Sequence, residues 1–231
     1  MMKLDTGGYY IDLSSYGLDT LKTRLTHIHL MSSQEILQED MDDRFATLAS
    51  FGIQNLKQLQ TRLKDKKAVV AFAEQSGLPE EYLTVLRRWV NGYQPKPVNL
   101  SEFDPVAEEV VQKLSQMGIR NTLQLFPRVR TPDLRRSFAK ETGISKSEIL
   151  ILTKLTDLVR LKWVGPKFAH LLLASGFDTV EKVASADGIA LYNHLKKVGE
   201  ETGIYKGGFS EDDINLWVQH VVCDVPISIS Y

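Results

Sequence analysis

The residues best suited to bind an anion are Lys and Arg, and they concentrate in the middle of the chain. Residues 120–170 hold eleven Lys and Arg against four Asp and Glu, although the whole chain has 28 basic and 29 acidic residues and a formal net charge of −1. Such a basic block is typical either of a surface that binds phosphate or of a solvated helical face. A sequence pI near 6.5 argues against a protein that coats nucleic acid constitutively.

Other residue types that carry out chemistry are sparse. His27 and His29 could present two imidazoles on one face of a strand, but no third metal ligand stands at a useful spacing. The acidic run 39–43 lacks the alternating ligands of a calcium loop and fits the start of a helix better. Cys223 is the single cysteine and has no catalytic partner near it in the sequence. We therefore predict a protein that is not an enzyme and that has neither a metal site nor a cofactor.

The elements that must position the basic residues are indicated by six glycines with matching surroundings. The first set is Gly52, Gly118 and Gly176, and the second set is Gly77, Gly143 and Gly203. Each glycine of the first set comes four residues after a leucine and just before a bulky apolar residue. Three positions after each of them stands a residue that commonly caps helices, namely Asn55, Asn121 and Thr179. The pattern predicts helices that end at a left-handed glycine and restart at a cap, in about three tandem units.

The periodicity of apolar residues favours an all-α fold. Apolar side chains recur at helical spacing in residues 82–90 and 106–117. Strand-like alternation is confined to residues 9–13 and 225–229, which we expect to pair as a short N- and C-terminal β ribbon.

Composition and breaker residues indicate how the chain is divided. At 43% hydrophobic residues, and without an apolar run long enough to cross a membrane or a recognisable secretory leader, the chain is expected to be a cytoplasmic protein with no membrane partner. The expected segments are an N-terminal arm (1–39), a first helical unit (40–93), a proline-rich linker (94–105), two further helix-hairpin-helix-like units (106–221) and a C-terminal tail (222–231).

The stretch from Leu158 to Val180 resembles a helix-hairpin-helix element. The resemblance lies in the core Val164-Gly-Pro-Lys-Phe-Ala169 and in the Ala-Ser-Gly-Phe that follows it. Together with the spacing of the glycines, residues 40–220 resemble the uncharacterised family called domain of unknown function 4332. That resemblance implies a fold and no established activity.

The resemblance also implies roles for the residues of the turn. In helix-hairpin-helix proteins, a glycine turn aims backbone N–H groups at a phosphate, and the following helix start and a lysine add positive charge. By this resemblance Gly165 is the turn glycine, Lys167 faces the phosphate, and Arg160 and Lys162 flank the turn. Four arginines of the basic block are expected to assist, namely Arg128, Arg130, Arg135 and Arg136.

Two features depart from the helix-hairpin-helix pattern. The position two residues before Gly165, where the motif has a second glycine, is occupied by Trp163. A side chain there could block a phosphate, pack into the core or stack on a base. The corresponding turns of the other two units, residues 39–41 and 105–107, lack the hairpin glycine, and the first of them is acidic. The hairpin could therefore also be a purely architectural joint between two packed helices.

Two functions from different classes follow. In the first, the protein is a non-catalytic module that binds the phosphate backbone of DNA or RNA through residues 120–170, without reading base sequence. In the second, it is a helical adaptor for a protein partner or for a second copy of itself. The adaptor function would depend on exposed apolar residues, with Trp163 and Trp217 as candidates.

Overall fold

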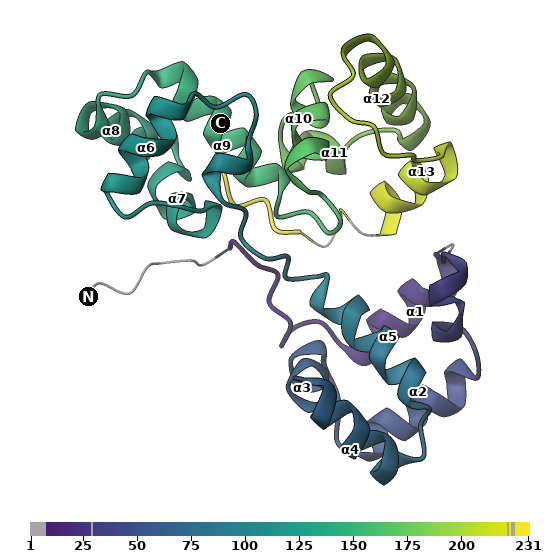
Figure 1. Ribbon diagram of the computed structural model, residues 1–231. Helices are drawn as coiled ribbons and strands as arrows, with labels where there is room; N and C mark the ends of the chain where they lie inside the picture. Colours follow the sequence, from purple (N-terminus) through teal and green to yellow (C-terminus); the bar gives the residue numbers. More distant parts are fainter. Residues whose placement is uncertain (1–7, 29, 221, 223–224) are drawn as a thin grey trace. The chain divides into compact units, whose positions relative to one another are not determined.

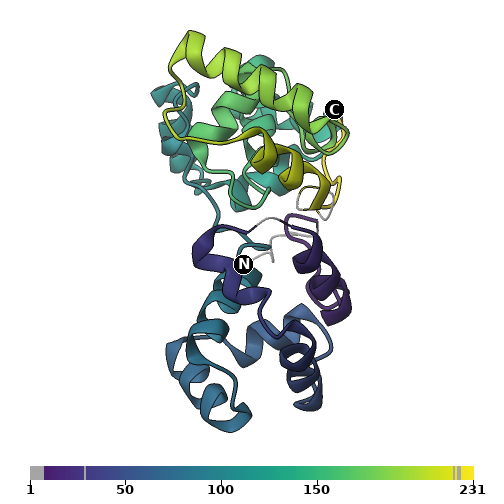
Figure 2. The same cartoon turned by 90° about the vertical axis from the view of Figure 1, so that its right-hand side faces the viewer.

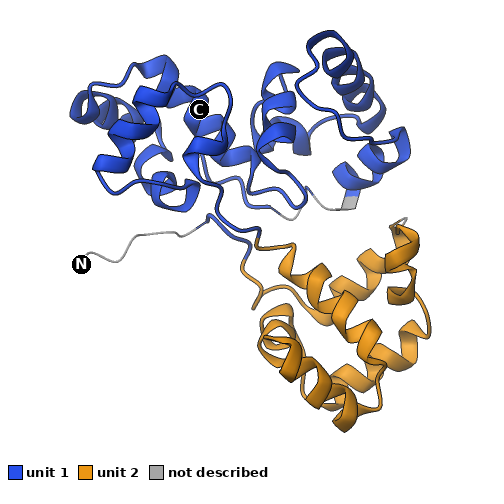
Figure 3. Cartoon of the chain, in the orientation of Figure 1, with its two compact units in different colours: residues 1–11, 95–231 blue, residues 12–94 orange. Residues whose placement is uncertain are grey.

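The computed structural model describes residues 8–28, 30–220, 222 and 225–231. These residues form helices joined by turns, and none of them belongs to a strand, so the all-α prediction is confirmed (Figure 1). No helix within these residues is both long and apolar enough to cross a membrane. The chain forms two compact units: unit 1 contains residues 1–11 and 95–231, and unit 2 contains residues 12–94 (Figure 3).

Unit 2 is a small helical bundle. Its helices are α1 (Leu18–His27), the 3-10 helix η1 (Ser32–Leu37), α2 (Met41–Ser50), α3 (Leu56–Arg62), α4 (Lys66–Ser76) and α5 (Glu80–Asn91). Helix α5 is amphipathic and packs against α3, α4 and η1. Residues 12–39 belong to the segment 1–39 that we expected to be an arm, and they supply α1 and η1 to this bundle and bury Leu21, Leu25 and Leu37 in it.

Unit 1 contains the basic block and is built around α9. Its helices are the 3-10 helix η2 (Leu100–Glu102), α6 (Glu108–Gln116), α7 (Thr122–Val129), α8 (Pro132–Thr142), α9 (Lys146–Leu158), α10 (Pro166–Ala174), α11 (Val180–Ala184), α12 (Gly188–Thr202) and α13 (Glu211–His220). Helix α9 packs against α7, α8 and α10 and buries Ile149, Leu152, Leu155 and Leu158. Helices α12 and α13 lie side by side in both views (Figures 1 and 2).

The glycines and caps behave as their local pattern predicts. All six glycines of the two sets have positive φ, between 64° and 81°. Those of the second set end α4, α8 and α12. The predicted caps Asn55, Asn121 and Thr179 each accept a backbone N–H bond at the start of the next helix. These local predictions are confirmed, and they explain where the short helices begin and end.

The expected β ribbon between residues 9–13 and 225–229 does not form. The two segments lie close together, since a Cβ built on Gly8 would stand 2.5 Å from the hydroxyl of Ser228. However, the carbonyl oxygens of Gly8, Tyr9 and Pro226 accept hydrogen bonds from the guanidinium of Arg160. The side chain of one arginine therefore takes the place of a strand ladder, and the alternating pattern at the two ends reflects burial of Tyr9 and Ile229 against Phe126.

Candidate functional site

The turn between α9 and α10 reverses the chain within a few residues. Hydrogen bonds between backbone groups extend beyond the end of α9. The last of them joins the N–H of Val164 to the carbonyl of Leu161 at 3.1 Å. Trp163 lies between these two buried residues with φ at 71°, the left-handed conformation that glycine adopts readily. The tryptophan thus keeps the backbone geometry of a glycine at the position where the helix-hairpin-helix pattern has one.

Helix α10 begins without a capping side chain. Gly165 is its N-cap in an extended conformation, with φ at −90°, and Pro166 is its first residue. No described side chain accepts a hydrogen bond at this helix start, and a Cβ built on Gly165 would meet no atom within 4 Å. Because the N–H groups of a first helical turn have no partner within the helix, this exposed end can bind an anion.

Lys167 stands in the first turn of α10 and is already paired. Its side chain is 60% exposed, and its ammonium forms an ion pair with the carboxylate of Asp104. Nδ1 of His170 lies 3.9 Å from the same carboxylate. The hydrogen bond from Lys167 lowers the pKa of Asp104 below its ordinary value, so this carboxylate is ionised at neutral pH. Asp104 therefore competes with any other anion that would approach Lys167.

The ring of Trp163 is available on the surface of unit 1. The residue is 54% exposed, although a side chain of this size usually loses more of its surface to packing. The ammonium of Lys162 lies 4.7 Å from the ring centroid, at a distance where a cation is attracted to the π face. A planar group such as a nucleobase could stack on the remaining exposed part of the ring.

Arg160, which was expected to flank the turn and contact phosphate, is buried. Nε donates to the carbonyl of Tyr9 at 3.1 Å, and Nη2 donates to the carbonyls of Gly8 and Pro226. Nη1 binds the carboxylate of Asp157. With its side chain fully enclosed and its donors engaged, Arg160 holds both ends of unit 1 against α9 and presents nothing to a ligand.

Asp157 completes this buried network. It is only 3% exposed, and burial raises the pKa of its carboxyl group, while the charge of Arg160 acts in the opposite direction. It accepts hydrogen bonds from the N–H of Val180 at 3.0 Å and from the hydroxyl of Tyr231 at 3.1 Å. The network thus joins α9, the start of α11 and the last residue of the chain.

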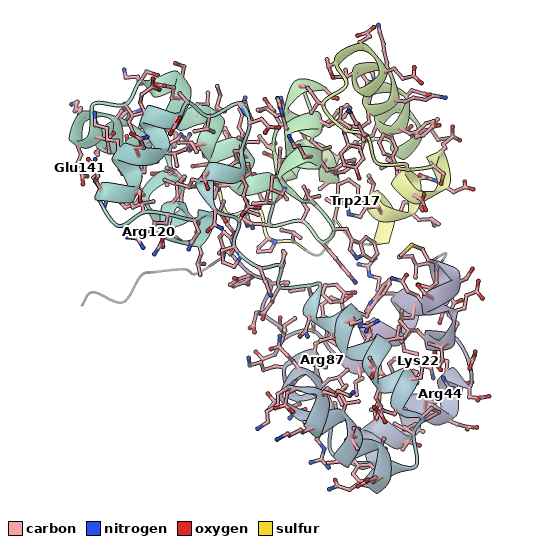
Figure 4. All side chains as sticks on the ribbon, in the orientation of Figure 1. Lys22, Arg44, Arg87, Arg120, Glu141 and Trp217 are labelled. Atoms are coloured by element: carbon pink, nitrogen blue, oxygen red, sulfur yellow. The ribbon has the colours of Figure 1, made fainter. Side chains whose placement is uncertain are left out.

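Lys162, the other residue expected to flank the turn and contact phosphate, is also buried. It is 2% exposed, and its carbonyl accepts a 3.1 Å hydrogen bond from the indole N–H of Trp217. Figure 4 labels Trp217 on α13. Trp217 is itself buried, with 5% of its surface exposed. Of the two tryptophans considered for partner binding, only Trp163 is on the surface.

The four arginines expected to assist do not converge on the turn. Arg128 pairs with Glu141, which Figure 4 labels on α8, and its guanidinium lies 4.9 Å from the ring centroid of Phe138. The guanidinium of Arg130 lies 5.8 Å from the ring centroid of Phe126. Arg135 and Arg136 line a separate cavity, to which residues 163–167 contribute nothing.

Metal ligands do not gather in the described part of the chain. No group of three or more His, Cys, Asp and Glu there is placed to hold a metal ion. Nδ1–H of His27 donates to the carbonyl of Thr23, 2.8 Å away. His29 and Cys223 lie outside the described residues.

Two parts of the site could not be read from the sequence. Asp104 precedes Lys167 by 63 residues, within the segment expected to be a linker, and no local pattern links the two. One feature of the sequence pointed to the left-handed conformation of Trp163, namely that it occupies the position of a motif glycine. The residue type gave no such indication, because tryptophan rarely adopts positive φ.

The comparisons with known proteins return one match. The family described as domain of unknown function (DUF4332) matches residues 104–221, which is just over half of the chain. The match lies within unit 1 and covers α6 to α13, including the α9–α10 turn. The comparisons with curated proteins and with solved structures return no match.

Proposed function

The chain belongs to the family described as domain of unknown function (DUF4332), and we propose that it is a non-catalytic module that binds the phosphate backbone of nucleic acid through the α9–α10 turn, in the manner of a helix-hairpin-helix. The observation that carries this proposal is the uncapped, exposed start of α10 directly after a left-handed turn. The contacts proposed are the backbone of Gly165 and Phe168 and the ammonium of Lys167. Contacts of this kind bind any sequence, because phosphates are the same at every step.

The surroundings of the turn support this mode of binding. A Cβ would fit at Gly165, so the space beside its backbone is open to a phosphate oxygen. Lys167 is exposed and its partner Asp104 is itself 47% exposed, so a phosphate can replace that carboxylate at little cost. Arg160 and Lys162 are left out of the contact set because both are buried.

Trp163 supports a preference for single strands. Its half-exposed ring is within two residues of Gly165, so a strand whose phosphate lies at the helix start can place a base on the ring. Bases in a duplex are stacked on each other and cannot reach it. We therefore propose that single-stranded DNA or RNA binds more tightly than duplex.

The same exposed ring favours the second candidate, an adaptor for a protein partner. An exposed tryptophan is typical of the centre of a protein interface. Such a complex would tolerate salt, since burial of an apolar ring does not depend on counterions, whereas phosphate binding would not. Salt dependence therefore separates the two candidates.

The test is fluorescence anisotropy with labelled 20-nucleotide single strands and duplexes of DNA and RNA, at about 50 and 200 mM salt. Two phosphate contacts predict that the affinity falls about tenfold over this range. We expect Lys167→Glu to weaken binding about tenfold or more, and Trp163→Ala to weaken binding to single strands more than to duplexes.

The matched control is Lys197→Glu on α12, an exposed lysine of the same unit that undergoes the same reversal of charge. It should leave binding within about twofold of the wild type, because Lys197 is not one of the proposed contacts and salt screens the field of an exposed charge. Absence of binding at 50 mM salt, or equal losses in Lys167→Glu and Lys197→Glu, would contradict the proposal. In the first case a salt-resistant complex with a protein partner becomes the function to pursue.

A further inference from the structure

Unit 1 has a second concentration of positive charge, away from the α9–α10 turn. A cavity of about 540 Å³ lies among α8, α9, the start of α11 and the last residue of the chain. Its basic lining residues are Arg135, Arg136, Lys146, Lys154 and Lys182. The volume falls in the range of pockets that hold small molecules.

The charges lining the cavity do not cancel. Asp178 is the single acidic lining residue, and its carboxylate is shared by the ammonium groups of Lys154 and Lys182. Two cations on one anion leave a surplus of one positive charge. Burial by itself raises the pKa of Asp178, but the hydrogen bonds from the two lysines lower it overall, so the carboxylate is ionised at neutral pH.

Two further cations of the cavity have no carboxylate partner. Arg135 donates from Nη1 to the carbonyl of Val129 at 2.9 Å, and its guanidinium lies 5.4 Å from the ring centroid of Tyr231. Lys146 is exposed and pairs with no acidic side chain among the described residues. Arg136, by contrast, is neutralised by Asp133 on its own helix. The side chains that line the cavity thus carry a surplus of about three positive charges.

Two of the cations, Lys154 and Lys182, are held in place before any ligand arrives. Lys182 is fixed by Asp178 at 2.7 Å and by the carbonyl of Gly176 at 3.2 Å, and Lys154 is only 22% exposed. Partial burial also lowers the pKa of the Arg135 guanidinium, and a bound anion would offset that cost. Cations that are already ordered lose little entropy on binding, and their partial burial strengthens the attraction to an anion.

We propose that this cavity binds a small phosphorylated molecule with at least two negative charges, such as a nucleoside di- or triphosphate or an inorganic polyphosphate. The phosphates would contact Lys146, Arg135 and the Lys154–Lys182 pair. The cations come from separate helices and converge on one hollow, which matches a compact polyanion better than a chain of phosphates spaced along a strand. The ring of Tyr231 and the side chain of Leu150 offer apolar wall to an organic group.

The test is isothermal titration calorimetry on the full chain with tripolyphosphate, ATP and adenosine in low-salt buffer without divalent cations. We expect tripolyphosphate and ATP to bind and adenosine not to bind. Equal affinity for the two phosphates assigns recognition to the phosphate chain, and tighter binding of ATP adds a contribution from the organic group. Both results support the site, whereas binding of adenosine alone, or of none of the three, overturns it.

Two double variants with reversed charges test whether the anion binds in this cavity. Lys146→Glu with Lys182→Glu changes two exposed lysines of the cavity, and we expect affinity for tripolyphosphate to fall about a hundredfold, tenfold for each lost contact. Lys140→Glu with Lys197→Glu makes the same change in net charge at exposed positions that do not line the cavity, and we expect less than a threefold effect. Equal losses in the two pairs overturn the proposal, because they would mean binding by net charge alone.

A measurement on the wild type keeps the proposal testable if a variant fails to fold. Amide resonances of Thr179 and Lys182 should shift on addition of tripolyphosphate, at lower concentrations than any shift at Gly165 and Phe168. Shifts confined to Gly165 and Phe168 would place the anion at the start of α10 and overturn this inference. The nucleic-acid proposal has its own variants at Lys167 and Trp163, so failure of either proposal leaves the other intact.

Discussion

The turn before α2 and the turn before α10 share a backbone feature and differ in charge. Asp40 and Trp163 are the non-glycine residues of the described chain with positive φ, at 44° and 71°. Each lies shortly before a helix, Asp40 twelve residues before Gly52 and Trp163 thirteen residues before Gly176. In the first turn, Arg44 donates to the carbonyl of Ile36 at 2.7 Å and pairs with the carboxylates of Glu39 and Asp40.

The two turns share a left-handed residue but differ in charge and in ion pairing, so the backbone conformation alone does not imply that both bind the same ligand. The turn before α2 is acidic and is closed by a buried arginine from the following helix. In the turn before α10 the buried arginine, Arg160, lies on the other side of the reversal and binds backbone carbonyls, which leaves the helix start open. In the first turn, the charged groups pair with one another. In the second turn, Arg160 binds buried carbonyls, while the start of α10 stays exposed.

The largest effect on the free energy of unfolding is expected when the buried arginine of either turn is replaced by alanine. Arg160→Ala should lower the free energy of unfolding by about 3–5 kcal/mol, because it leaves Asp157 buried without its charge partner and frees three carbonyls. Arg44→Ala should cost only about 1–2 kcal/mol, since Glu39 and Asp40 remain hydrated. Urea unfolding followed by circular dichroism measures both, and a larger cost for Arg44→Ala would reverse this comparison.

The next largest effect on stability is expected from the left-handed backbone conformation that Asp40 and Trp163 share. Trp163→Gly should be more stable than Trp163→Ala by about 1 kcal/mol, because alanine keeps the steric cost of positive φ and glycine removes it. The same difference is expected between Asp40→Gly and Asp40→Ala. Thermal unfolding of the four variants tests this, and each Gly–Ala pair is its own control for loss of the native side chain. No difference in either pair would mean that the strain is relieved elsewhere.

A smaller effect is expected from the carboxylate that competes for Lys167. Asp104→Asn should raise the affinity for single-stranded DNA about two- to fivefold at 50 mM salt, since a phosphate no longer displaces a charged partner. Anisotropy titration measures this gain. Glu102→Gln, which removes one negative charge from an exposed residue two positions away, serves as the control and should change affinity less. Unchanged affinity in Asp104→Asn would mean that nucleic acid does not approach Lys167.

The smallest effect on stability is expected at Gly165. Its φ is negative and a Cβ would meet no atom, so Gly165→Ala should change the free energy of unfolding by less than about 0.5 kcal/mol. Gly176→Ala is the contrast, because φ at 81° should cost that variant about 1 kcal/mol. If the phosphate contacts the backbone at Gly165, Gly165→Ala should still weaken nucleic-acid binding severalfold. A stable Gly165→Ala that binds normally would remove Gly165 from the site.

Much of the local structure could be predicted because its causes are local. A glycine that ends a helix and an Asn or Thr that caps the next one act through their own backbone and its nearest neighbours, so their spacing revealed the helix boundaries. The prediction of a β ribbon was wrong because pairing between the two ends of the chain depends on distant residues. Alternating apolar residues show that one side of a segment is buried, and they do not say whether its carbonyls bind another strand or, as here, a guanidinium.

The sequence by itself determined that this chain is helical, where its short helices stop, and that its positive charge gathers in residues 120–170. Only the tertiary structure decided which of those charges are usable. Arg160 and Lys162 are buried, Lys167 is exposed beside Asp104, and Arg135 and Lys146 meet Lys182, from outside the block, around a cavity. The reason is that charge is a property of composition, whereas exposure and pairing depend on which distant segments pack together.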